Sequence, residues 1–146
     1  MSDSGEDVIT MEELKYLSIF QEFTDAMAYR CIIDEDGNRL IFLVDSADVG
    51  KAIGRNGKKV RMLSEIFKKN VEVVAYSEDL EQMIRNLFPG VKILSIDVQS
   101  RGDEKSVIVK VAEEDKARAI GREGKNVKRA RLVLKKLFNV TRLQIR

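Results

Sequence analysis

IGRNGKKVR at residues 53–61 and IGREGKNVK at residues 120–128 are two copies of one pattern, Ile-Gly-Arg-x-Gly-Lys-x-Val followed by a basic residue. In each copy two glycines flank two residues, which predicts a tight turn that another backbone can approach closely, because no Cβ stands in the way. A helix with a basic outer face is expected to begin at each turn. The N–H groups at a helix start lack intrahelical partners and carry the positive end of the dipole, so the sequence predicts a phosphate-binding site at each turn.

The segments before and after the first turn predict a compact α-β-β-α-α-β unit. Thr10 and Glu13 have the spacing of a capping box at the start of a helix. Apolar runs at 29–33 and 39–44, separated by a turn-rich insert, are typical of an antiparallel hairpin. Apolar positions at helical spacing predict the inner faces of the first helix and of the helix after the turn: Tyr16, Ile19, Phe20, Phe23 and Met27 in one; Val60, Leu63, Ile66 and Phe67 in the other. A short helix capped by Ser46 or Asp48 and running to Ile53, and a strand at 71–75, complete the unit.

The second half of the chain repeats this order. A helix capped by Ser77, with Leu80, Met83, Ile84, Leu87 and Phe88 on one face, ends at Pro89-Gly90. Strands are expected at 92–99 and 105–111, a short helix at 113–120, and a last strand in which Thr141, Leu143 and Ile145 alternate. The helix after the turn is expected to bury Val127, Ala130, Val133, Leu134, Leu137 and Phe138. Gly54 and Gly121 lie 67 residues apart, which exceeds the usual solenoid period and indicates a duplicated small domain.

Composition points to a polyanion as partner. Residues 1–48 hold 3 Lys and Arg against 12 Asp and Glu, whereas residues 49–146 hold 23 against 12. This asymmetry favours a polyanion at the second part, although a solvated charged surface is the simpler alternative. The acidic start of the chain has no apolar signal core, and no run is long enough to span a bilayer, so we expect a cytoplasmic protein without membrane contact.

The residue inventory argues against catalysis. There is no His for general-base work or metal binding, and one cysteine, Cys31, can build neither a disulfide framework nor a thiolate metal site. Gly50, Gly54 and Gly57 give GxxxGxxG, which matches neither of the common nucleotide-binding loops. We therefore expect no enzyme activity, no cofactor, no metal and no small-molecule substrate.

The turns and the basic residues beside them form the predicted binding site. Arg55 and Arg122 are expected to bond phosphate oxygens, while lysines farther along each helix could equally form a solvated face. The carboxylate of Glu123 would repel phosphate, so the two halves are expected to contribute unequally. Base contacts would require a shallow apolar groove between the helix after each turn and the neighbouring strand. Ile53, Val60, Ile120 and Val127 would line this groove, although such residues are more often plain core. The predicted RNA-binding residues are Lys51, Ile53, Gly54, Arg55, Asn56, Gly57, Lys58, Lys59, Arg61, Lys116, Arg118, Ile120, Gly121, Arg122, Glu123, Gly124, Lys125, Asn126, Lys128 and Arg129.

With both glycine turns placed in an α-β-β-α-α-β order, the chain resembles tandem type II KH domains, and most closely the archaeal NusA-like transcription termination and antitermination factors. The segments that carry the resemblance are 31–34, 42–44, 50–58, 71–79 and 119–127. The resemblance implies an α+β fold of two KH domains, at 9–76 and 77–146 after a disordered acidic N-terminus at 1–8. Each domain would hold a three-stranded mixed sheet covered by helices on one face. It also implies a single-stranded RNA segment lying across both GXXG turns, and an association with RNA polymerase.

Three other functions remain open from the sequence. A general KH factor in ribosome biogenesis or translation would use the same turns. Duplex DNA recognition by a helix–turn–helix is possible because each turn joins two helices. In an interaction adaptor, the acidic first helix and hairpin would bind a basic protein and the glycines would be structural.

Overall fold

The computed structural model describes residues 8–146, and these residues form two compact units, 8–76 and 77–146. Residues 1–7, most of the segment expected to be disordered, lie outside the described residues.

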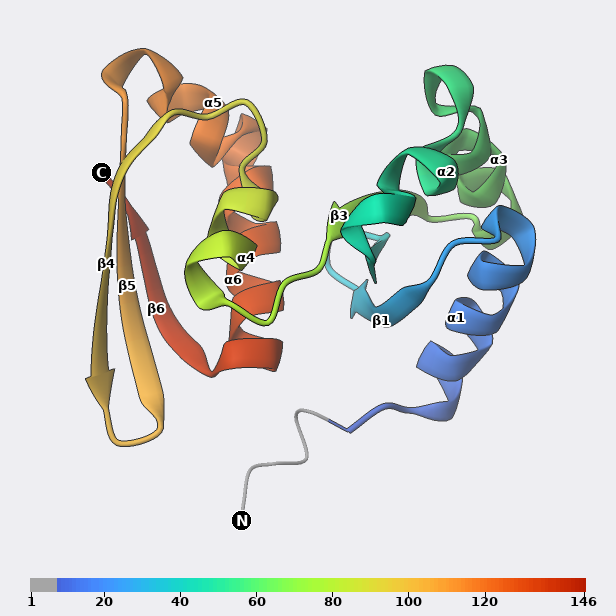
Figure 1. Ribbon diagram of the computed structural model, residues 1–146, viewed down its shortest axis with the longest axis horizontal. Helices are drawn as coiled ribbons and strands as arrows, with labels where there is room; N and C mark the ends of the chain where they lie inside the picture. Colours follow the sequence, from blue (N-terminus) through green and yellow to red (C-terminus); the bar gives the residue numbers. More distant parts are fainter. Residues whose placement is uncertain (1–7) are drawn as a thin grey trace. The chain divides into compact units, whose positions relative to one another are not determined.

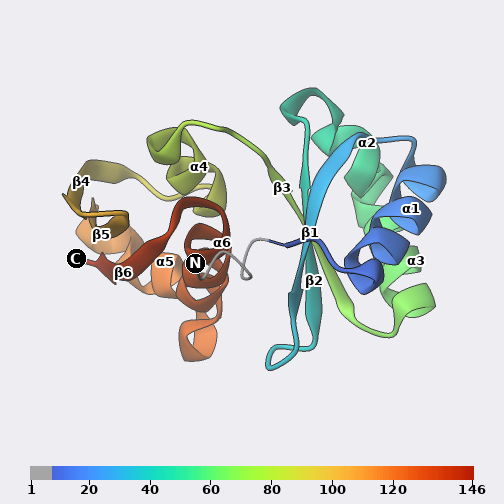
Figure 2. The same cartoon turned by 90° about the horizontal axis from the view of Figure 1, so that it is seen from below.

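The first unit contains three helices and one three-stranded sheet (Figure 1). Its elements are α1 Met11–Thr24, β1 Ala28–Asp34, β2 Arg39–Val44, α2 Val49–Ile53, α3 Lys58–Phe67 and β3 Asn70–Ala75. The strand order is β1-β2-β3, with β1 antiparallel and β3 parallel to the central β2. The helices lie on one face of this sheet (Figure 2).

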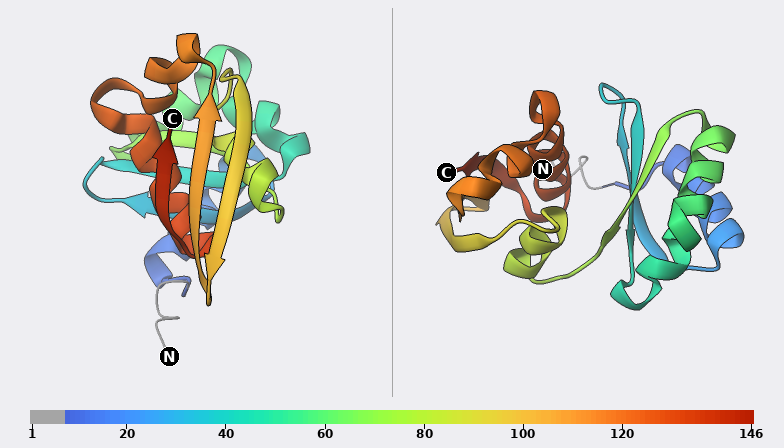
Figure 3. Two further views of the ribbon diagram at one scale, coloured as in Figure 1. Left: turned by 90° about the vertical axis from the view of Figure 1, so that its left-hand side faces the viewer. Right: turned by 90° about the horizontal axis from the view of Figure 1, so that it is seen from above.

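The second unit repeats the same order. Its elements are α4 Leu80–Leu87, β4 Ile93–Arg101, β5 Glu104–Val111, α5 Lys116–Ile120, α6 Lys125–Phe138 and β6 Val140–Ile145. Antiparallel β4 and parallel β6 flank the central β5, and Figure 3 shows this sheet face-on. The expected fold, two α-β-β-α-α-β units each with a mixed three-stranded sheet, is confirmed.

Alternation along β2 builds the core of the first unit. Leu40, Phe42 and Val44 are fully buried and share one cluster with residues of the helices, as a period of two predicts for one face of a strand. Phe42 stacks on Phe20 of α1 with ring centroids 4.0 Å apart. This packing fixes α1 against the sheet, and Leu63 of α3 belongs to the same cluster.

The capping box of α1 is only half formed. Thr10 accepts a hydrogen bond from the Glu13 N–H (3.1 Å), as expected. The Glu13 side chain instead turns inward, where its carboxylate accepts from Arg30 Nε and from the Cys31 N–H, both at 2.8 Å. Burial, and then the nearby Glu13 carboxylate, raise the pKa of the Cys31 thiol above its usual value.

Some predicted inner faces and caps were wrong. Ile19 and Ile66 are 43% and 53% exposed, and Leu17 supplies the buried position on α1 instead. Met27 lies beyond the end of α1 and is 55% exposed. Neither Ser46 nor Asp48 caps the short helix before the first turn through its side chain.

Two sequence expectations in the second unit also need correction. Asp79, not Ser77, caps α4 by accepting from the Gln82 N–H (3.0 Å), because the Ser77 hydroxyl is engaged by the Asp79 N–H. In β6 the register shifts at Thr141, which leaves that residue exposed and breaks the simple alternation, while Leu143 is buried as predicted.

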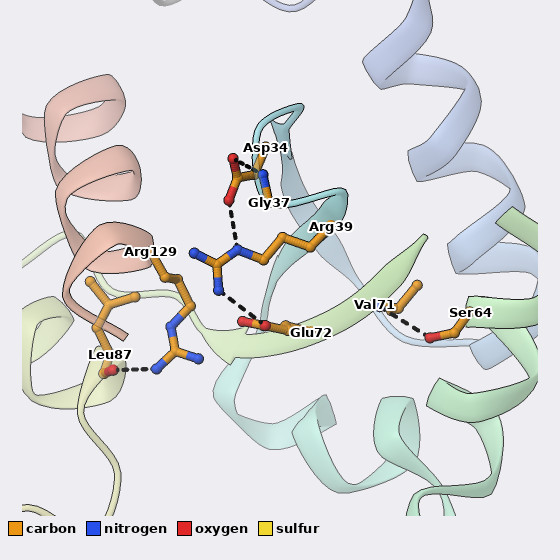
Figure 4. A network of polar contacts seen from close by, with 8 residues as sticks. All are labelled: Asp34, Gly37, Arg39, Ser64, Val71, Glu72, Leu87 and Arg129. Carbon is orange, nitrogen blue, oxygen red and sulfur yellow. Dashed lines mark hydrogen bonds and ion pairs between the residues drawn. The ribbon is translucent and has the colours of Figure 1, made fainter. Parts of the chain in front are cut away.

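Polar contacts brace the edges of each unit (Figure 4). Arg39, 2% exposed at the start of β2, donates to the carboxylates of Asp34 (2.7 Å) and Glu72 (3.3 Å) and so joins all three strands. In the second unit Arg129 Nη2 of α6 donates to the Leu87 carbonyl oxygen (2.8 Å) at the end of α4. Arg129, predicted from the sequence to bind RNA, thus contacts the neighbouring helix.

Candidate nucleic-acid interface

The two glycine turns have nearly the same backbone geometry. Gly54 and Gly121 have φ of 79° and 82° with ψ of 169° and 166°. The N–H of the second glycine donates to the carbonyl oxygen of the first in both turns, at 3.1 Å for Gly57 and 3.0 Å for Gly124. Both sequence copies therefore fold into one and the same structure, at the start of α3 and of α6.

The two glycines of a turn serve different purposes. A Cβ on Gly54 would lie 3.0 Å from the backbone nitrogen of Lys59, and a Cβ on Gly121 would lie 2.9 Å from that of Asn126. The first glycine thus lets the turn pack against the following helix. A Cβ on Gly124 would have its nearest neighbours at 3.7 Å, an ordinary contact, so this second glycine is required by its φ of 73° and leaves the outer surface bare.

The residue before the second glycine differs between the turns. Asn56 and Glu123 both adopt left-handed backbone, with φ of 55° and 56°. Asn tolerates this region well, whereas Glu is strained there. Glu123 is exposed, so the second turn carries both a strained backbone and a surface carboxylate that the first turn lacks.

A stripe of residues continues from the second glycine along the helix that it precedes. Positions four, seven and eleven residues after that glycine share one side of a helix. We define the first stripe as Gly57, Arg61, Ser64 and Lys68, and the second stripe as Gly124, Lys128, Arg131 and Lys135. Each stripe is basic and largely exposed, with Ser64 and the two glycines partly buried.

Each stripe runs beside the third strand of its sheet. Ser64 Oγ accepts a hydrogen bond from the Val71 N–H of β3 (3.1 Å), as Figure 4 shows. Arg131 Nε and Nη2 donate to the Leu143 carbonyl oxygen of β6 at 3.3 and 3.1 Å. Turn, stripe and strand edge thus form one surface in each unit. Neither Ser64 nor Arg131 was among the predicted binding residues.

Two predicted basic residues brace the loop before the first strand of their unit. Lys51 Nζ donates to the Asp25 carbonyl oxygen at 3.2 Å and lies 3.7 Å from Asp48 Oδ1. Arg118 makes the equivalent contacts in the second unit, to the Gly90 carbonyl oxygen (2.7 Å) and to Asp115 (3.0 Å). Both side chains stay exposed, but their positions are set by these contacts.

The remaining predicted residues divide by exposure. Asn126 donates through Nδ2 to the Arg118 carbonyl oxygen (2.9 Å) and joins the helices on either side of the turn. Partly buried residues are Ile53, Lys59, Lys116 and Ile120. Exposed residues at or beside the turns are Arg55, Asn56, Lys58, Arg61, Arg122, Glu123, Lys125 and Lys128. An extended polyanion would meet this last group first.

Among residues 8–146, no three His, Cys, Asp or Glu side chains are grouped so as to hold a metal ion. Within that same part of the chain, no helix has the length and apolar character needed to cross a membrane.

Comparison with known proteins defines the class. The KH domain model matches residues 15–102, more than half of the chain, and the model of the NusA-like second KH domain matches residues 80–145. This chain belongs to the KH-domain family and carries two KH domains in tandem, the second of them NusA-like.

Individual relatives share the name NusA. The chain is 28% identical over 137 residues to the probable transcription termination protein NusA of Methanocaldococcus jannaschii, covering 94% of this chain and 74% of that protein. It is 24% identical to the protein of the same name from Thermoplasma acidophilum, with 99% of each covered. Among solved structures, the crystal structure of APE1850 is 58% identical, with a TM-score of 0.90, and covers 94% of this chain and 100% of that one.

Proposed function

We propose that this protein is a non-catalytic factor that binds single-stranded RNA through both GXXG turns and acts in transcription termination or antitermination. The observation that carries the proposal is the duplicated turn, with matching dihedral angles, at the start of two basic stripes. In KH domains such a turn clamps the backbone of about four nucleotides. The NusA names of the relatives supply the transcriptional role and suggest RNA polymerase as a partner in the cytoplasm.

The chemistry of each turn suits a phosphodiester backbone. A Cβ on Gly124 would make only ordinary contacts, and a Cβ on Gly57 would meet only the end of the Arg61 side chain. An exposed arginine, Arg55 or Arg122, lies between the two glycines of each turn. Arginine forms charge-assisted, two-pronged hydrogen bonds with phosphate oxygens. Such contacts supply affinity that falls with added salt and carries no sequence information.

The test replaces both central residues of each turn by aspartate: Arg55→Asp with Asn56→Asp, and Arg122→Asp with Glu123→Asp. We expect binding of a labelled single-stranded RNA to fall by more than about a hundredfold when both turns are changed, because each turn then repels phosphate. Fluorescence anisotropy at fixed salt measures the affinity, and circular dichroism checks that the thermal midpoint holds.

The matched control reverses two charges elsewhere in the second unit, Arg101→Asp and Lys110→Asp on the β4–β5 hairpin. This variant should bind RNA nearly as well as the wild type. Retained affinity in the turn variant, or an equal loss in the hairpin variant, would overturn the proposal. Preferential competition by duplex DNA would also count against it.

A further inference from the structure

Arg131 is held in an unusual position for an exposed cation. It lies in the middle of α6, on the second stripe, and both its Nε and its Nη2 donate to the Leu143 carbonyl oxygen. Two hydrogen bonds to one acceptor fix the plane of the guanidinium group, although the residue is exposed. The side chain is therefore oriented before any ligand arrives.

The carbonyl group that holds Arg131 points away from the sheet. The Arg146 N–H donates to the Val109 carbonyl oxygen, and the Arg146 carbonyl oxygen accepts from the Val111 N–H, so the backbone of residue 146 faces β5. Successive residues of a strand direct their backbone groups to opposite sides, which turns those of Leu143 toward the outer edge of β6. Arg131 thus lies along the edge of the strand beside the glycine turn.

The guanidinium group of Arg131 keeps two N–H donors at its outer end that the contact with Leu143 does not use. Arginine has five N–H donors, and the contact with Leu143 uses one on Nε and one on Nη2. The remaining hydrogens on Nη1 and Nη2 form a planar fork. Among the described residues no carboxylate forms an ion pair with Arg131, and the side chain stays exposed.

We propose that Arg131 reads a guanine base in the RNA strand bound by the second unit, donating its fork to O6 and N7 of the base. The proposal rests on the RNA-binding function above and adds a source of sequence preference to it. Arginine paired in this two-pronged way is the commonest guanine-specific contact in proteins that read base edges. Lys128 and Lys135 lie about one helical turn to either side on the same stripe and suit the phosphates of that strand.

The first unit has no arginine at the position of its stripe that corresponds to Arg131. Ser64 occupies the same place in its stripe, seven residues after the second glycine, and its hydroxyl oxygen accepts from the Val71 N–H. A serine has no planar fork, so at this position of the stripe only the second unit can read guanine. The two units then have different roles, because the base is read beside β6 in the second unit.

The test compares three single strands of about 12 nucleotides: one of adenine only, one with guanine at every third position, and one with 7-deazaguanine at those positions. The 7-deazaguanine strand differs from the guanine strand only in lacking the N7 acceptor. Anisotropy titrations use the full chain as wild type, as Arg131→Lys, which keeps the charge but not the fork, and as Arg131→Ser, which copies the first unit. Lys136→Ser is the control, because it removes a cation from another side of α6.

We expect the wild type and Lys136→Ser to bind the guanine strand roughly tenfold more tightly than either other strand. Both Arg131 variants should bind all three strands alike, close to the wild-type affinity for adenine, with thermal midpoints showing that they fold. Equal wild-type binding of guanine and 7-deazaguanine, or a preference that survives Arg131→Lys, overturns the inference while leaving RNA binding intact. A uniform weakening of all strands by Arg131→Ser, with the ratio kept, identifies a phosphate contact and also overturns it. Absence of binding to every strand would overturn the proposed function as well.

Discussion

At the scale of single residues, the glycines of one turn are not equivalent. In the second turn, a Cβ on Gly121 would lie against the backbone of Asn126, whereas a Cβ on Gly124 would make only ordinary contacts with side chains. Sequence alone gives both the same letter and the same expected role, since the pattern cannot tell which side of the turn meets the helix and which meets a ligand. Only the folded distances separate a packing glycine from a binding glycine.

Gly121→Ala and Gly124→Ala should therefore fail in different ways. Gly121→Ala combines a positive φ with a 2.9 Å approach to backbone, and we expect it to lower the free energy of unfolding by about 2–5 kcal/mol. For Gly124→Ala we expect a loss of only about 1–2 kcal/mol, because alanine is strained at a positive φ but makes no close contact there. The new methyl group, however, lies where the RNA backbone would lie. Urea unfolding and RNA titration of both variants measure the two effects. Equal destabilisation of the two would contradict this division, as would unchanged RNA affinity in Gly124→Ala.

At the scale of the elements, most boundaries could be predicted because they follow from local pattern. The run 39–44 becomes β2 with the same limits, and a helix begins directly after each glycine turn, as expected. The errors arise where a tertiary contact competes with local pattern, as when the carboxylate of Glu13 leaves its capping role for Arg30. The candidate site shows the same limit: the turns were predicted, whereas the contact of Arg131 with β6 depends on packing between segments 12 residues apart.

The carboxylate of Glu13 connects α1 to β1. Its side chain is buried with that of Arg30, at 5% and 11% exposure, so Glu13→Gln removes a carboxylate charge that faces the Arg30 guanidinium group inside the unit. We expect Glu13→Gln to lower the free energy of unfolding by about 3–5 kcal/mol, as measured by urea denaturation. Thr10→Ala, which removes only the cap of the same helix, should cost about 1 kcal/mol and serves as the comparison. A Glu13→Gln variant no less stable than Thr10→Ala would show that the ion pair contributes little.

At the scale of the whole molecule, duplication gives two similar candidate binding surfaces with different details. Both units have the same element order and the same turn. They differ in the residue before the second glycine, Asn56 or Glu123, and in the stripe residue at the strand edge, Ser64 or Arg131. We therefore expect the first turn to bind phosphate better and the second unit to supply the base contact. One strand held by both would combine affinity from the first with sequence preference from the second.

The dependence of affinity on RNA length tests whether both units hold one strand. A KH turn engages about four nucleotides, so strands of about 4–6 nucleotides should bind one unit at a time. Once a strand can reach both turns, the second contact becomes intramolecular, and affinity should rise by roughly 10²–10⁴. In the variant with Arg122→Asp and Glu123→Asp this step should vanish, leaving a gradual increase with length, because only the first turn still binds phosphate. Anisotropy titration of strands from about 4 to 24 nucleotides measures the curve. A wild-type curve without a step, parallel to that of the variant, would mean that the two units bind separate strands.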